Sequence, residues 1–367
     1  MIASASARPY ARAAAAAGYR VVALDAFADT DTCAHAAETH ALAYRDGGFD
    51  ANALDAVLSG LKSTAALGLA YGSGFEQQPD LLALAEQYMP LIGNPVGVVR
   101  SMKRAQTFFA LLDDLNIPHP AVRLQQMSRE DLNNVVWLLK RSGGSGGTHI
   151  RRVTENAALA PGSYYQQEVK GIPVSLLFAA DGSRAHVIGF NQQWLAPAPD
   201  IPFRYGGAVS HAEMPPGVRH QLLLAAQKLT AAASLRGLNS LDAIMQGDRL
   251  WILELNPRLT ATFDLYPTAD GGLFQLHLDA CRGNIAHWPQ LTGQAYAHYI
   301  FYAPEGMRLP ADFDWPDWVA DIPRSADGIA SGEPVCTVTA QAATAAEAVA
   351  LMAQRVRQLV DALKQAC

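Results

Sequence analysis

The nine residues LWILELNPR, at positions 250–258, constrain the fold more than any other part of the chain. Their bulky apolar first half is typical of a buried β-strand. Glu254 and Asn256 are two residues apart, so on a strand both side chains lie on one face. Pro257 ends the strand, and Arg258 follows at its rim. A carboxylate, an amide oxygen and a guanidinium gathered there suit Mg²⁺ held against phosphate oxygens. The alternative is a core strand whose polar end is merely solvated.

A second short strand, at residues 237–244, carries Asp242 twelve residues before Glu254. The turn signal Gly247-Asp248 joins the two strands as a hairpin, which would bring Asp242 beside Glu254. An acid on one strand and Glu-x-Asn-Pro-Arg on the next resembles the ATP-grasp superfamily. The resemblance implies that Asp242, Glu254 and Asn256 bind Mg²⁺ or Mn²⁺ ions that bridge the ATP phosphates. It also implies that Arg258 contacts the transferred phosphate or the acyl-phosphate.

Composition narrows the class of protein. The chain has 367 residues, of which 50% are hydrophobic and 17% charged, which predicts two to three compact lobes. A formal net charge of −6 predicts no nucleic acid or anionic membrane as a partner. No apolar run approaches the roughly 18–20 residues of a membrane span. The four cysteines are far apart and show no metal or redox spacing, so we expect a reduced, cytoplasmic protein.

The first lobe alternates predicted strands and helices. Residues 19–25 predict a buried strand that ends at Asp25, and residues 67–71 a weaker strand that runs into a glycine turn and Glu76. Asp25 would suit the ribose of a dinucleotide, but Gly-x-Gly-x-x-Gly is absent. In the family that the chain resembles, this lobe helps to bind the substrate. Ser6, Arg8, Asp25 and Glu76 are therefore substrate candidates, with helix caps and surface charges as the alternative. Residues 1–3 are short for a first strand, so either that strand is stunted or the true start lies upstream.

Two lysines are candidates for the ATP phosphates. Residues 101–116 show the apolar period of one amphipathic helix, and Lys103 lies near its predicted N-terminus, where a cation is mildly unfavourable unless an anion is near. The helix leads to Asn116-Ile117-Pro118-His119-Pro120, which is similar to a turn of the ATP-grasp family. Residues 135–140 predict a strand that ends at Lys140. By resemblance, both Lys103 and Lys140 bind phosphate.

A glycine-rich stretch follows Lys140 and Arg141, where the family often has proline. Glycines let backbone N–H groups approach phosphates without a Cβ in the way. A flexible linker is the alternative, but this stretch begins and ends on predicted buried strands. It is no Walker loop, because the Gly-Lys-Ser/Thr ending is missing. The predicted nucleotide-binding residues are Gly143, Gly144, Ser145, Gly146 and Gly147.

Residues 164–171 are similar to the family's hinge, where main-chain groups pair with adenine. The spacing between Glu168 and Gly171 is one residue shorter than the family's, so the prediction covers Gln166, Gln167, Glu168 and Val169. Further on, residues 203–208 predict a glycine-rich loop in a segment that faces substrate in related ligases. Arg204 there would clamp a carboxylate with its planar fork, or lie on the surface.

The predicted fold class is therefore mixed α/β (α+β): an ATP-grasp fold with a small Rossmann-like N-terminal lobe and two subdomains that sandwich ATP. We expect a pre-ATP-grasp domain at residues 1–100, a small lid subdomain at 101–165, and a large subdomain with the metal site at 166–300. Residues 301–367 would pack on the large subdomain.

The resemblance implies an ATP-dependent ligase that activates a carboxylate as an acyl-phosphate and joins it to an amine, with Lys140 and Arg258 as catalytic residues. Its partners would be small-molecule carboxylate and amine substrates, and a homodimer is compatible with it. Some carboligases of this look belong to one-carbon carrier pathways of the methanopterin or methanofuran type, which suggests cofactor biosynthesis. The alternatives are a carboxylase or kinase with another acceptor, and a non-catalytic nucleotide-binding regulatory protein. The intact metal triad argues against the regulatory protein.

Overall fold

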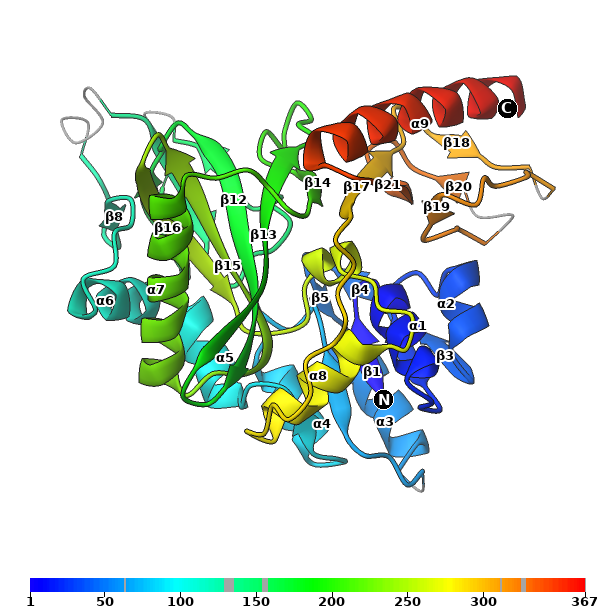
Figure 1. The fold of residues 1–367 in the computed structure, drawn as a ribbon, viewed down its shortest axis with the longest axis horizontal. Coiled ribbons are helices and arrows are strands. Elements are labelled where there is room, and N and C mark those ends of the chain that lie inside the picture. The colour runs from blue at the N-terminus through cyan, green and yellow to red at the C-terminus, as the bar shows by residue number, and fades with distance from the viewer. Residues whose placement is uncertain (63, 129–134, 154–157, 311, 325–327, 367) are drawn as a thin grey trace.

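The structure, a computed structural model, describes residues 1–62, 64–128, 135–153, 158–310, 312–324 and 328–366. Three β-sheets account for most of the arrangement in Figure 1. A parallel sheet and its helices lie at the bottom of that view, a small antiparallel sheet at the left, and a long antiparallel sheet runs across the top toward the C-terminal helix.

The N-terminal part is a parallel sheet in the order β3-β2-β1-β6-β7. Its strands are β1 (Ile2–Ser4), β2 (Val22–Asp25), β3 (Glu38–Ala41), β6 (Leu69–Tyr71) and β7 (Leu91–Ile92). Its helices are α1 (Arg8–Ala16), α2 (Thr30–His35), α3 (Ala51–Gly60) and α4 (Asp80–Glu86). The strand order reverses between β1 and β6, and in open α/β sheets such a switch point opens a crevice at the carboxyl ends of the strands. A small hairpin of β4 (Tyr44–Arg45) and β5 (Gly48–Phe49) projects beside it.

The predicted single helix over residues 101–116 is instead two helices. α5 (Val96–Lys103) ends where Arg104 adopts an extended backbone (φ −90°, ψ 118°), and α6 (Ala105–Asp114) begins directly after it. The apolar period continues across the break because Met102, Phe108 and Phe109 pack into one core cluster. Lys103 therefore lies in the last turn of α5, where the helix dipole favours a cation. The prediction that Lys103 lies near a helix N-terminus was wrong.

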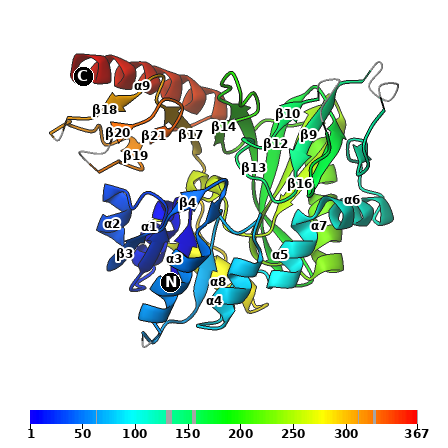
Figure 2. The ribbon, with the colours of Figure 1, turned by 180° about the vertical axis from the view of Figure 1, so that it is seen from behind.

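The small antiparallel sheet has the order β10-β9-β11-β8 and lies beside α6. Figure 2 shows β9 and β10 on the same side of the molecule as β16, the strand that carries Glu254. The strands of the small sheet are β8 (Val122–Arg123), β9 (Trp137–Arg141), β10 (Arg151–Arg152) and β11 (Ser163–Gln167).

The long sheet is antiparallel throughout, in the order β16-β15-β12-β13-β14-β17-β21-β19. Its first strands are β12 (Ile172–Asp181), β13 (Ala185–Leu195), β14 (Tyr205–Val209), β15 (Arg236–Gln246) and β16 (Arg249–Asn256). The later strands are β17 (Ala295–Tyr302), β19 (Val319–Ala320) and β21 (Pro334–Ala342). β18 (Met307–Arg308) and β20 (Gly328–Ile329) pair separately.

Both faces of β12 are buried, which explains its nearly continuous apolar sequence. Leu176 packs into the core under α7 (Pro216–Ala233), and the neighbouring Leu177 packs into the core shared with α1 and α8 (Gly272–Cys281). α9 (Ala345–Ala366) packs along β17 and β21. A 3₁₀ helix, η2 (Ala261–Leu265), connects β16 to α8. No helix among the described residues is long and apolar enough to cross a bilayer.

The limits of the four predicted segments stay a prediction. The limit at 100/101 falls inside α5, that at 165/166 inside β11, and that at 300/301 inside β17.

Candidate functional site

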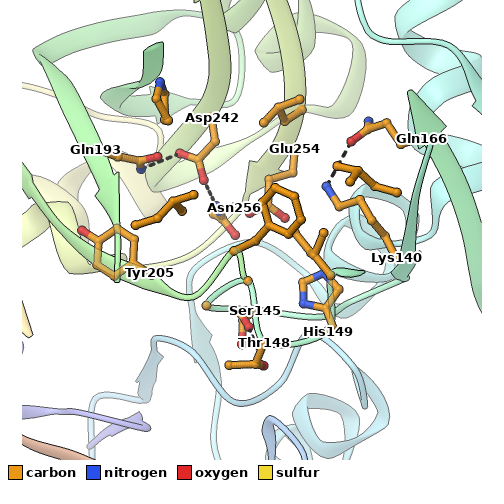
Figure 3. A pocket seen from close by; sticks show the side chains of 18 of the residues that line it. Lys140, Ser145, Thr148, His149, Gln166, Gln193, Tyr205, Asp242, Glu254 and Asn256 are labelled. Atoms are coloured by element: carbon orange, nitrogen blue, oxygen red, sulfur yellow. Dashed lines mark hydrogen bonds between the residues drawn. The ribbon is translucent and has the colours of Figure 1, made fainter. Parts of the chain in front are cut away.

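The predicted hairpin is confirmed. β15 and β16 pair in antiparallel register, with Asp242 opposite Glu254 and Ser240 opposite Asn256. Gly247 has a φ of +60° in the turn, a conformation that favours glycine. Figure 3 shows Asp242, Glu254 and Asn256 facing the same space. The Asn256 Nδ2 donates to Asp242 Oδ2 at 2.8 Å, so strand spacing and hairpin register together gather the three side chains.

The two carboxylates influence each other's protonation. Burial and the neighbouring charge of Glu254 raise the pKa of Asp242. Burial alone would raise the pKa of Glu254 too, but Lys103 and Lys140 outweigh it and lower that pKa. Two neighbouring carboxylates cannot both be ionised cheaply without a counter-charge. A divalent cation would supply that charge, so this pair fits a metal ion.

The donor set is small and made of oxygen. Among the described residues, no group of three or more His, Cys, Asp and Glu side chains is placed to hold a metal ion. Asp242 and Glu254 supply two carboxylates, and the Asn256 amide oxygen is the third candidate ligand. Oxygen donors of this kind suit Mg²⁺, which is usually bound through one or two carboxylates together with waters and substrate phosphates.

Two lysines approach the acids from different elements. The Lys103 Nζ donates to Asn256 Oδ1 at 2.6 Å and to Glu254 Oε2 at 3.3 Å. The Lys140 Nζ, at the end of β9, donates to Gln166 Oε1 at 3.1 Å. Burial, and secondarily the charge of Lys103, lowers the pKa of Lys140, while Glu254 opposes that shift. The structure therefore brings both predicted lysines to the predicted metal ligands.

Residues 142–150, which we call the glycine flap, connect β9 to β10 and lie against Glu76 and against residues 203–205. Tyr205 N donates to Gly146 O at 2.9 Å. A Cβ on Gly143 would collide with the Glu76 carbonyl oxygen, and one on Gly147 with that of Phe203. Some of the glycines are thus explained by close packing against neighbouring backbone, which the sequence alone did not indicate.

A cavity of about 1020 Å³ lies between the small sheet, the long sheet and the glycine flap. This is at the upper end of the range of about 300–1,000 Å³ typical of ligand pockets. The sequence-predicted residues that line it are Lys140, Ser145, Gly146, Gly147, Gln166, Gln167, Glu168, Val169, Asp242, Glu254, Asn256 and Arg258. Lys103, Gly143 and Gly144 instead line a small void of about 20 Å³ behind the flap, which also borders Glu254.

The predicted hinge borders the cavity where β11 ends. Gln166 is buried, and its Nε2 has no partner among the described residues. Glu168 forms a two-pronged ion pair with Arg152, at 2.7 and 3.0 Å. The Glu168 N donates to the Val136 carbonyl at 2.8 Å. The Glu168 carboxylate is therefore paired with β10 at the edge of the cavity.

Arg258 is held in place by Glu76. The Arg258 Nε donates to Glu76 Oε1, and its Nη1 donates to the carbonyl of Leu259 at 2.8 Å. Although burial acts in the opposite direction, Arg258 lowers the pKa of the Glu76 carboxyl. Glu76 does not line the cavity but holds Arg258, which does, so its contact with the substrate stays a prediction.

Two other substrate candidates are also engaged elsewhere. Arg8 is buried and forms ion pairs with Asp264 at 2.6 Å and Asp321 at 2.8 Å. Arg204 donates to the carbonyls of Ala196 at 2.8 Å and Gly332 at 3.0 Å. Neither arginine lines the cavity. That Arg8 and Arg204 meet the substrate stays a prediction, and their places outside this cavity do not support it. The predicted loop at 203–208 is in fact the strand β14 from Tyr205 onward.

Ser6 and Asp25 have structural roles at the first strand–helix turn. The Ser6 hydroxyl donates to Asp321 Oδ1 at 3.0 Å. Asp25 accepts backbone N–H groups from Ala7 at 2.6 Å and from residues 27 and 28 at 2.7 Å. These bonds fix the turns after β1 and β2 without capping a helix, and neither residue lines the cavity.

Other cavity residues were not identified from the sequence. They are Tyr44, Asp46, Ser73, His149, Gln193, Tyr205, Thr260 and Thr262. Two had a local signal: Asp46 precedes Gly47 in a two-residue turn signal, and Ser73 lies in the glycine turn after β6. His149 lies in the glycine flap and Tyr205 in the predicted loop at 203–208, although neither was assigned a role. No local pattern marks Tyr44, Gln193, Thr260 and Thr262.

Comparisons with known proteins agree with this geometry. Residues 104–262 match the family model described as the ATP-grasp domain. None of the curated proteins matches the chain in sequence. Among solved structures, an L-amino acid ligase from Bacillus licheniformis is similar with a TM-score of 0.70 and 14% identity; the match covers 98% of this chain and 96% of that chain.

Two carboxylases are similar as well. One is the biotin carboxylase domain of the Hydrogenobacter thermophilus 2-oxoglutarate carboxylase, a dimer in complex with MgADP, ADP and bicarbonate. It has a TM-score of 0.73 and 14% identity, and the match covers 96% of this chain and 88% of that chain. Rhizobium etli pyruvate carboxylase has a TM-score of 0.73 and 15% identity over 97% of this chain. The chain spans 36% of that carboxylase's length.

The fold is therefore the ATP-grasp fold, and the predicted mixed α/β class is confirmed. The chain carries an ATP-grasp domain, which confirms the recognition of this superfamily from its sequence.

Proposed function

We propose that the protein is an ATP-dependent ligase that joins a carboxylate to an amine. A carboxylate oxygen of the first substrate attacks the γ-phosphorus of ATP and displaces ADP, which forms an acyl-phosphate. The amine then attacks the acyl carbon, inorganic phosphate leaves, and the amine loses a proton. The enzyme's contribution would be to position the reactants and to neutralise charge.

The residues around the cavity suit this reaction. Asp242, Glu254 and Asn256 would hold Mg²⁺ or Mn²⁺. When bound, the ion would offset the negative charge of the ATP phosphates. Lys103 and Lys140 would add positive charge on the side of the small sheet. Arg258, which Glu76 orients, would stabilise the transferred phosphoryl group.

One observation carries the proposal. Asp242 and Glu254 are paired directly across two strands, and Lys103 bonds both Glu254 and Asn256 from a separate helix. Two acids, an amide and two lysines around one cavity lower the stability of the fold unless a ligand binds them. Such a ligand must carry both positive and negative charge. Magnesium with a nucleoside triphosphate has that charge pattern.

Removal of a metal ligand tests the assignment. Glu254→Gln and Asp242→Asn should lower the rate of ADP formation with Mg²⁺ and ATP by about 10³-fold or more, because neither amide supplies the charge that an ion needs. Nucleotide binding, measured by calorimetry with a non-hydrolysable ATP analogue, should weaken far less. Asp248→Asn, in the exposed turn of the same hairpin, is the matched control. Wild-type turnover in Glu254→Gln would rule the site out.

The alternative reactions differ in their products. A carboxylase would need bicarbonate for ADP release, a kinase would form a stable phosphorylated product, and the ligase needs both a carboxylate and an amine. A screen of carboxylates and amines for ADP release would find the substrates. A carboxylate labelled with ¹⁸O should then pass one labelled oxygen to inorganic phosphate, as an acyl-phosphate requires. ATP turnover without any ligated product across the screen would favour the regulatory protein.

Some expectations remain part of the proposal. They are a role in cofactor biosynthesis, a homodimer and a cytoplasmic location. The dimer is supported by the assembly of the Hydrogenobacter thermophilus carboxylase domain. Sedimentation of the purified protein would test it.

A further inference from the structure

We propose that His149, in the glycine flap, is a phosphate-binding residue that contacts the β- and γ-phosphate end of ATP. This inference rests on the proposed function, because it assumes that the cavity binds a nucleoside triphosphate. It assigns a role to a residue of the flap other than its glycines, in addition to the two lysines of the site.

The position of the ring is the first argument. His149 lines the large cavity together with Lys140 and Glu254, and it also borders the void beside Lys103. Figure 3 shows its imidazole on the flap, facing the space between Lys140 and the hairpin acids. A group at that place lies between the predicted lysines and the predicted metal ligands, which is where the charged end of a nucleotide would be.

The second argument is an unused hydrogen-bonding group. The Nδ1 of His149 is buried and has no partner among the described residues. A buried polar atom without a partner is costly, and native structures usually supply one. Gln166, whose Nε2 is likewise buried without a partner, lies on the same side of the cavity. A ligand that enters the cavity could satisfy such groups.

The third argument is that the chain makes room for this ring. A Cβ on Gly144 would overlap the imidazole carbons and nitrogen of His149. The φ of Gly144 is not in the left-handed region, so its backbone does not itself demand glycine. Glycine at 144 is therefore explained by the ring that packs on it. This separates Gly144 from Gly143 and Gly147, whose neighbours are backbone atoms.

The charge of the ring is consistent with this role. Burial and then the charge of Lys140 lower the pKa of His149 to about 4, so the ring is neutral at pH 7. A neutral imidazole has one N–H donor and one acceptor. It would donate to a phosphate oxygen without adding a third positive charge beside Lys103 and Lys140.

The test measures binding of the magnesium complex of a non-hydrolysable ATP analogue by calorimetry. His149→Ala should weaken binding by about 10- to 100-fold, the usual loss for one hydrogen bond to a charged group. Either His149→Asn or His149→Gln, which place an amide N–H near the position of one ring nitrogen, should recover part of the loss. The melting temperature of the ligand-free protein should change little in all three variants.

Gly144→Ala supplies a matched comparison. In the wild-type background it should displace the ring and weaken binding, whereas in His149→Ala it should add little, because the overlapping ring is gone. This non-additivity would tie the two residues together. Equal effects of Gly144→Ala in both backgrounds would contradict the proposed packing.

The outcomes distinguish the two proposals. If the wild-type protein binds no magnesium–ATP analogue, the proposed function fails. If the wild type binds it and His149→Ala binds it within about twofold, this inference fails and the proposed function stands. Weakening that neither amide variant relieves, together with a lower melting temperature, would assign His149 to packing alone and would also overturn the inference.

Discussion

One buried histidine makes the stability of this protein depend on pH. His277, on α8, is 1% exposed; its Nδ1 accepts from Leu238 N at 3.0 Å, and its Nε2 donates to the Ile92 carbonyl at 3.1 Å. The bond from Leu238 needs the neutral ring, because a protonated Nδ1 cannot accept. Burial lowers the pKa of His277 to about 4, from its ordinary value of 6.5.

This geometry predicts how stability depends on pH. Between pH 6.5 and about 4 the unfolded chain binds a proton at His277 that the folded protein does not, so this contribution is complete above pH 6.5 and is lost as pH falls. The loss would reach about 3 kcal/mol near pH 4. In urea unfolding, the free-energy gap between the wild type and His277→Gln should therefore narrow as pH falls through this window.

The exposed residue His220 provides the control: His220→Gln should leave the pH dependence of the free energy of unfolding close to that of the wild type. A gap between the wild type and His277→Gln that stays constant from pH 7 to pH 4.5 would contradict the prediction.

At the scale of single residues, the sequence predicted the positions of those side chains that follow from local spacing. Glu254 and Asn256 share a face because strand side chains alternate, and Asp242 joins them because a tight turn sets the register. The surroundings of Arg8 and Arg204 could not be foreseen because their partners are distant in sequence. Nothing near Arg8 indicates that Asp321 will meet it. Lone charged residues therefore could not be placed from the sequence.

At the scale of elements, the glycine flap combines backbone freedom with close packing. Gly146 and Gly147 both have positive φ, of 63° and 70°. A Cβ on Gly146 would meet open space, whereas one on Gly147 would strike the Phe203 carbonyl. Comparing the two glycines therefore separates backbone strain from contact with residues 203–205, which the flap also meets through the bond from Tyr205 N to Gly146 O.

Alanine at each position should expose this difference. Both variants carry similar backbone strain of about 1 kcal/mol. Gly147→Ala should in addition hold the flap away from Phe203 and lower turnover by about tenfold more than Gly146→Ala. Steady-state ADP release measures the rates, and hydrogen exchange across residues 142–150 measures the opening of the flap. Equal rates in the two variants would show that the contact with Phe203 is not needed.

Element types were predictable where the period was strong, as in α7 and in the hairpin of β15 and β16. The break between α5 and α6 was not, because the apolar period continues through Arg104 and no glycine or proline marks it. The break ends α5 at Lys103, whose ammonium group reaches Glu254 and Asn256.

At the scale of the whole molecule, one buried arginine connects segments far apart in the chain. Arg8 begins α1, while Asp264 lies in η2 and Asp321 follows β19. Asp31 on α2 approaches the same guanidinium at 3.6 Å and accepts the backbone N–H groups of Asp321 and Ile322. The N-terminal sheet, the segment after the hairpin of β15 and β16, and the C-terminal part thus meet at Arg8.

Loss of this arginine should destabilise the protein strongly. Arg8→Ala would leave the carboxylates of Asp264 and Asp321 without their buried counter-charge, at a cost of about 3–5 kcal/mol in the free energy of unfolding. Arg12→Ala is the matched control: Arg12 also pairs with Asp264, at 2.8 Å, but its side chain is 44% exposed. Its loss should cost about 0–1 kcal/mol. Similar unfolding midpoints in urea for the two variants would contradict the expected role of Arg8.

The continuity of the long sheet has a practical consequence for anyone who shortens this protein for expression. A truncation after residue 300 would cut β17 in two and remove β21, so most of the backbone pairing beyond β14 would be lost. Strand edges stripped in this way tend to recruit other chains. The smallest fragment that keeps the long sheet intact and stays dispersed should therefore extend through α9.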